Sequence, residues 1–145
     1  MRQFLYPAIL TLDEKDGGYV VTFPDIPEAI TQGDTVEEAL SEASDCLAEA
    51  IANRIVLGLP IPEASSRVRE AYMIPLPGLM AAKAALYLAI QKTEITKAEL
   101  AKKLECDEKK IDLLLDPSHV SDLAEIESAL AVLKQRLVVG FQEAA

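Results

Sequence analysis

The first part of the chain alternates between apolar and polar positions, as a strand does when one of its faces is buried. Two alternating runs, residues 4–12 and 19–23, flank a segment of turn-forming residues, Asp13-Glu14-Lys15-Asp16-Gly17-Gly18. Strand-like runs on both sides of such a segment predict a β-hairpin. The apolar members of the alternation are Phe4, Tyr6, Ala8, Leu10, Leu12, Tyr19, Val21 and Phe23.

The period changes to that of a helix after Thr35. Thr35 is a suitable N-cap and Glu38 completes a capping box, whereas Gly58 and Pro60 indicate where the helix ends. We expect residues 67–74 to add the final strand. The apolar stripe that should face the sheet consists of Val36, Ala39, Leu40, Ala43, Leu47, Ala50 and Ile51.

Pro75 and Pro77-Gly78 indicate a boundary between two domains. Beyond it, helical patterns occupy residues 79–92, 96–104, 107–115 and 121–133. Residues 136–141 are β-branched and apolar, and we expect a strand there that pairs with a second copy. The sequence therefore predicts an α+β protein: residues 1–78 form a small antiparallel sheet with one long helix, and residues 79–145 form an all-α domain with a short C-terminal strand.

The spacing of apolar residues between positions 96 and 115 is typical of a helix-turn-helix. Such a motif needs two inward faces, a small residue where the helices cross and a filled turn. The six positions that match are Leu100, Ala101, Leu104, Cys106, Ile111 and Leu114. Glu105 occupies a turn position at which we expect a left-handed conformation. The alternative is a plain helical hairpin without a DNA-binding role.

Several polar side chains of this segment are candidates for contacts with DNA. The second helix carries acidic residues where bases would be read, and lysines nearby are placed to contact phosphates. His119 has either a turn or cap role or a phosphate contact. The candidates are Thr96, Lys97, Lys102, Lys103, Glu108, Lys109, Lys110, Asp112 and His119.

Charge is distributed unevenly between the two predicted domains. The chain has a net charge of −10; residues 1–78 carry five basic and 13 acidic side chains, whereas residues 79–145 carry nine and 11. An acidic first domain repels nucleic-acid phosphates and suits a basic protein partner. The alternative is that the charge serves solubility alone.

The sequence offers little support for catalysis, a metal or a membrane. The two cysteines, Cys46 and Cys106, and the single histidine, His119, do not have zinc-site spacing. Asp13, Asp16 and Asp25 are not placed to converge on a metal pair, and no phosphate-binding glycine loop is present. We therefore expect no enzyme activity and no cofactor. We also expect no signal peptide, no membrane span and a cytoplasmic location.

Three short segments resemble the HicB antitoxin family of bacterial toxin–antitoxin systems: Gly17-Gly18-Tyr19, Phe23-Pro24-Asp25-Ile26-Pro27, and Thr31-Gln32-Gly33-Asp34-Thr35 leading into Glu37-Glu38-Ala39. The resemblance covers residues 6–59, and residues 95–139 resemble the helix-turn-helix tail of some members. It implies a truncated ribonuclease H-like first domain that masks a HicA-type toxin, a small basic ribonuclease. It also implies repression of the operon through operator DNA. We expect a homodimer or tetramer formed through the C-terminal domain.

For toxin binding, we expect carboxylates in the loops to face the basic partner, with two apolar residues as central anchors. The alternative for Phe23 and Ile26 is packing in the core. The competing function is a stand-alone transcription regulator with a ligand-sensing N-terminal domain. The candidate toxin contacts are Asp13, Glu14, Asp16, Phe23, Asp25, Ile26, Glu28 and Asp34.

Overall fold

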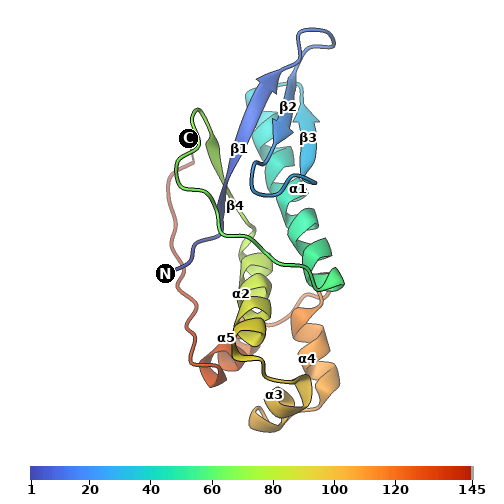
Figure 1. Ribbon diagram of the computed structural model, residues 1–145, viewed down its shortest axis with the longest axis vertical. Coiled ribbons are helices and arrows are strands. Elements are labelled where there is room, and N and C mark those ends of the chain that lie inside the picture. Colours follow the sequence, from blue (N-terminus) through green and yellow to red (C-terminus); the bar gives the residue numbers. More distant parts are fainter. Residues whose placement is uncertain (145) are drawn as a thin grey trace. The chain divides into compact units, whose positions relative to one another are not determined.

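The computed structural model describes residues 1–144 and divides into two compact units, Met1–Ala81 and the residues from Ala82 onward. The first unit holds a four-stranded sheet and one long helix, and the second is helical (Figure 1). The α+β class expected from the sequence is confirmed.

The sheet of the first unit has the order β3-β2-β1-β4 and is antiparallel throughout. Its strands are β1 (Leu5–Leu12), β2 (Tyr19–Thr22), β3 (Ile30–Gly33) and β4 (Tyr72–Pro75). The expected hairpin is β1 with β2. The long central strand pairs in halves, because residues 5–8 pair with β4 and residues 9–12 pair with β2.

This pairing in halves explains why β1 tolerates Pro7 in its middle. Leu76 N–H donates to the Phe4 carbonyl at 2.9 Å, so even-numbered residues of β1 direct their backbone groups toward β4. Pro7 therefore faces the β2 side, beyond the last paired position of β2, Thr22 opposite Ile9. No ladder hydrogen bond is lost through its missing N–H.

The helix α1 (Val36–Leu57) covers one face of the sheet (Figure 1). It begins as expected, since the Thr35 hydroxyl accepts from Glu38 N–H at 3.1 Å. It ends at Gly58, whose φ of 69° is left-handed. A stripe at helical spacing is buried against the sheet: Ala39, Ala43, Leu47, Ile51 and Ile55.

The second unit is built from α2 (Gly78–Thr93), α3 (Lys97–Lys103), α4 (Glu108–Leu115) and α5 (Leu123–Val132). All four helices lie where the sequence pattern predicts them, with ends shifted by one or two residues. Their apolar faces meet in one core. Its fully buried members include Ala82, Ala84, Leu86, Leu100, Ile111, Ile126 and Ala129.

Two expected strands differ from what the single chain shows. The last strand of the sheet begins at Tyr72 and not at residue 67, because Glu70 has a left-handed φ of 56° and the chain is not extended there. At residues 136–141 the single chain is neither helical nor paired, and the expected pairing with a second copy stays a prediction. A strand needs a neighbour for its backbone groups, and this segment has none within residues 1–144. Val138 and Val139 are exposed by 62% and 79%, and Phe141 is fully exposed.

Candidate partner-binding surfaces

The hairpin turn between β1 and β2 presents three of the expected toxin contacts. Asp13 Oδ1 accepts from the N–H groups of Lys15 and Asp16 at 3.1 and 3.2 Å, so its carboxylate shapes the turn. Asp13 N–H also donates to the Gly18 carbonyl at 2.9 Å. The side chains of Glu14 and Asp16 are exposed and remain available to a partner.

The loop between β2 and β3 uses its two carboxylates to hold the chain together. Glu28 receives both Arg54 Nε and Nη2, at 2.6 and 2.8 Å, and this pairing lowers the pKa of Glu28 and raises the pKa of Arg54. Asp25 accepts from the N–H and the hydroxyl of Ser65, at 2.8 and 2.5 Å. Each carboxylate is therefore already occupied by a group of the same unit.

Phe23 and Ile26 do not fit the role of exposed anchors. Phe23 is 2% exposed and Ile26 is 0% exposed. Two tight turns fold the loop back, with Ile26 N–H donating to Phe23 O at 3.2 Å and Ala29 N–H donating to Ile26 O at 2.9 Å. Both apolar side chains are thereby directed into the core. The expectation that they anchor a partner is wrong for this structure, and the core-packing alternative holds.

A larger acidic surface lies on α1 and is not among the toxin contacts that the sequence pattern predicts. Glu38, Glu42, Asp45 and Glu49 are all exposed, and their spacing of four, three and four residues places them on one side of the helix. No ion pair within residues 1–144 neutralises them. We call these four residues the α1 acidic face. Asp34 is exposed just before α1, and its N–H donates to Glu38 at 3.3 Å.

In the second unit, the helices α3 and α4 have the inward residues that the sequence predicts. Leu100 and Ile111 are fully buried, and Ala101 and Leu114 nearly so. Leu104 and Cys106 are half-buried. Glu105 has a φ of 55°, the left-handed conformation expected at this turn. Thr96 makes a complete capping box with Glu99 and is occupied as the N-cap of α3.

Only part of the expected phosphate-contacting charge is free. Lys97 pairs with Asp112 at 2.5 Å, and Lys110 pairs with Glu125. These pairs connect α3 with α4 and α4 with α5. Three lysines are exposed and form no ion pair within the described part of the chain: Lys102, Lys103 and Lys109. Glu108 is exposed in the first turn of α4.

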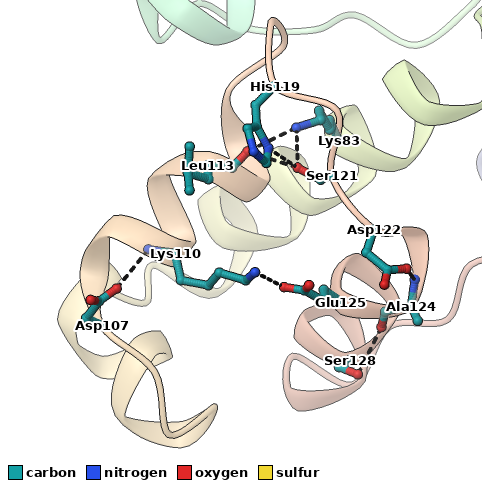
Figure 2. Close-up of polar contacts among 10 residues, drawn as sticks. All are labelled: Lys83, Asp107, Lys110, Leu113, His119, Ser121, Asp122, Ala124, Glu125 and Ser128. Carbon is teal, nitrogen blue, oxygen red and sulfur yellow. Dashed lines mark hydrogen bonds and ion pairs between the residues drawn. The ribbon is translucent and has the colours of Figure 1, made fainter.

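His119 lies in the turn after α4, next to a lysine that the sequence pattern does not single out. His119 N–H donates to Asp116 O at 3.1 Å, and His119 Nδ1 lies 3.0 Å from Ser121 Oγ. Ser121 also receives Nζ of Lys83, a fully buried residue of α2 (Figure 2). The only signal in the sequence is a lysine in the middle of an Ala- and Leu-rich helix, with apolar neighbours on both sides.

Two further properties concern metals and membranes. Within residues 1–144, no three His, Cys, Asp or Glu side chains are grouped so that they could hold a metal ion. No helix of this part of the chain combines the length and the apolar character needed to cross a bilayer.

Comparison with known proteins places the chain in a family of bacterial proteins. The model of a family described as "HicB_like antitoxin of bacterial toxin-antitoxin system" matches residues 5–85, the sheet, α1 and the start of α2. The chain therefore belongs to the HicB-like antitoxin family.

Individual relatives extend the likeness over nearly the whole chain. It is 35% identical over 132 residues to Antitoxin HicB of Escherichia coli, which covers 91% of this chain and 95% of that protein. It is 30% identical over 141 residues to Antitoxin HicB of Pseudomonas fluorescens, covering 97% of each. Antitoxin HicB 2 of Photorhabdus laumondii is 37% identical over 132 residues, which is 91% of this chain and 92% of that protein.

Proposed function

We propose that this chain binds a small basic ribonuclease toxin of the HicA type and masks its RNA-binding surface. The observation that carries the proposal is the α1 acidic face in a unit of the HicB-like family. A toxin that binds RNA must present positive charge, and an ordered row of carboxylates competes with RNA phosphates for that charge. Electrostatic complementarity of this kind accelerates association and selects the partner.

The free carboxylates and the occupied ones have different roles in this proposal. Glu14, Asp16 and the α1 acidic face are exposed and face a partner's cations without first breaking an ion pair within residues 1–144. Asp25 and Glu28 hold the loop to Ser65 and Arg54, so they keep the unit in its shape. The protein acts by binding alone and has no catalytic role of its own.

Association kinetics test the α1 acidic face. The double variant Glu42→Lys, Glu49→Lys is compared with the wild type and with the charge-matched control Glu127→Lys plus Glu143→Lys, which alters exposed acids of the second unit. We expect the association rate with the purified toxin to fall at least about tenfold at low salt, while the control stays within about twofold. Equal rates for all three chains would contradict the proposed surface.

We also propose that the second unit binds operator DNA of the chain's own operon, as a homodimer or tetramer. The buried pattern of α3 and α4, with the free Lys102, Lys103 and Lys109 outside it, supports a helix-turn-helix that contacts phosphates. Asp107 and Glu108 at the start of α4 oppose strong binding to a polyanion. Two half-sites in a dimer offset this by doubling the contacts.

A gel shift with the operon's promoter at several salt concentrations tests the operator proposal. Three free lysines in each copy predict a steep fall of affinity with salt. The absence of a shift at low salt, both with and without the toxin, would contradict it. Membership of an antitoxin family favours this pair of roles over a stand-alone regulator with a ligand-sensing domain.

A further inference from the structure

The most completely bonded buried charge of the second unit is Lys83 of α2. It is 0% exposed, and its Nζ donates to three acceptors: Leu113 O at 3.0 Å, Asp116 O at 2.7 Å and Ser121 Oγ at 2.8 Å. Figure 2 shows Nζ pointing to Ser121 and toward the Leu113 end of α4. Three acceptors use all three N–H bonds of an ammonium group, so the buried cation is fully hydrogen-bonded.

The position of Pro117 explains why α4 needs this lysine. In a continuing helix, the carbonyl of Leu113 would accept from the N–H four residues later, which is position 117. Proline has no N–H, and the helix ends at Leu115. Within residues 1–144, the backbone offers Leu113 O only a long 3.3 Å bond from Asp116 N–H. Lys83 Nζ and Ser121 Oγ, at 3.0 and 3.1 Å, supply the missing donors.

The hydrogens around Ser121 can be assigned from the same contacts. Its hydroxyl has one proton, which it donates to Leu113 O. Its two lone pairs then accept from Lys83 Nζ and from His119, so His119 carries a hydrogen on Nδ1. No buried side-chain nitrogen or oxygen in residues 1–144 is left without a partner. A buried hydrogen-bond network in which every group has a partner favours a single arrangement of the segments that it joins.

We propose that Lys83 is a positioning residue for α4, and that it sets the direction in which α4 meets DNA. The inference rests on the operator binding proposed above. Lys83 fixes the C-terminal end of α4 to α2 through hydrogen bonds, whereas the polar contact between α4 and α5 is the partly exposed ion pair of Lys110 with Glu125 (Figure 2). Exposed pairs contribute little because water and salt screen them. Since Lys83 is fully buried, it acts on DNA only through α4.

The variant Lys83→Met tests this role, because methionine has a similar length and no donor. Lys92→Met is the matched control: it removes one positive charge from an exposed position of the same helix. For Lys83→Met we expect operator affinity to fall at least tenfold, with an unchanged slope of log K against log salt. A lysine that contacts phosphate would instead lower that slope by about one. Amide hydrogen exchange in residues 112–120 should accelerate at least tenfold in Lys83→Met and not in Lys92→Met.

If Lys83→Met does not fold, the variant Ser121→Ala tests the same role of Lys83. It leaves Lys83 with its two carbonyl acceptors, so we expect a smaller loss of affinity in the same direction and faster exchange at the end of α4. Unchanged affinity in the folded variants, or a salt slope lowered by about one in Lys83→Met, would overturn the positioning role. A wild-type chain that binds no operator fragment would instead overturn the operator proposal. Unchanged amide hydrogen exchange in residues 112–120 of Lys83→Met and Ser121→Ala would show separately that Lys83 does not hold α4.

Discussion

Replacing Gly33 by alanine should strongly destabilise the first unit. Its loss of stability should exceed that of Gly78→Ala, since Gly78 is the other glycine of residues 1–81 without a left-handed φ. Gly33 ends β3 and lies against the start of α1. A Cβ added there would lie 2.4 Å from Ala39 N, 2.6 Å from Ala39 Cα and 2.9 Å from Glu38 C. All three are backbone atoms, so no side-chain rotation can remove the overlap.

The size of the effect follows from the distances. Ordinary contact begins at 3.4 Å, so β3 and α1 must separate by about 1 Å at a point where the core is closed. Overpacking against rigid surroundings costs about 1–3 kcal/mol and occasionally more. We expect the upper end, about 3 kcal/mol of unfolding free energy. In a unit of this size, this corresponds to a melting temperature lower by about 12–24 °C.

Two other glycines separate the overlap from other effects of the substitution. A Cβ at Gly78, in the first turn of α2, meets nothing within 4 Å, and the residue has no left-handed strain, so Gly78→Ala should change stability by less than about 1 kcal/mol. Gly17 also has open space but a φ of 76°. Gly17→Ala therefore isolates backbone strain, and we expect a loss of about 1 kcal/mol.

Urea unfolding followed through amide NMR signals of residues 1–81 measures these losses without interference from the second unit. From most to least stable, the expected order is Gly78→Ala, Gly17→Ala and Gly33→Ala. Toxin binding should weaken only for Gly33→Ala, at temperatures where this variant is partly unfolded. A Gly33→Ala chain as stable as Gly78→Ala would refute the reasoning about this close approach.

Three further predictions concern other parts of the chain. Because the bonds from Arg54 lower the pKa of Glu28, the folded chain keeps this carboxylate ionised to lower pH than the unfolded chain does. The wild type should therefore be more stable than Glu28→Gln, by at most about 1 kcal/mol because Glu28 is 44% exposed. This difference in stability should be complete above about pH 5 and should disappear as the pH falls through the lowered pKa of Glu28. Urea midpoints at pH 7 and pH 3 measure it, and an equal difference at both pH values would contradict the role of the Arg54 bonds. Glu105→Gly should stabilise the second unit by about 1 kcal/mol, measured by calorimetry, because its φ of 55° suits glycine; a loss of stability would contradict this. Val139→Lys with Phe141→Lys should lower the oligomeric state in light scattering if residues 136–141 pair between copies, and an unchanged mass would contradict that pairing.

The sequence predicts those element ends at which a residue type has one strong physical reason to occur. Thr35 and Thr96 accept hydrogen bonds from the first turns of α1 and α3, and Gly58 takes the left-handed conformation after α1. Other ends have no such signal. Glu94 after α2 and Lys134 after α5 are also left-handed, with φ of 55° and 59°, although neither is glycine. Residues other than glycine rarely adopt this conformation, so no local sequence pattern indicates it.

The candidate surfaces were harder to predict, because they depend on how the chain folds back. Whether Phe23 lies inside or outside is decided by the two turns that close its loop. Asp25 is occupied by Ser65, which is 40 residues away in sequence. Lys83 is needed because Pro117 leaves a carbonyl of α4 without its donor, and only the packing of α2 against α4 brings the two together. The α1 acidic face, by contrast, is visible in the helical spacing of its four residues.

Mixing the purified chain with the purified HicA-type toxin proposed as its partner, and measuring both binding and RNA cleavage over a range of salt, tests the central claim most directly. The account predicts a stable complex in which cleavage stops once the chain is in excess, with association that slows as salt rises. Full cleavage by the toxin in dilute buffer with the chain in excess would contradict it.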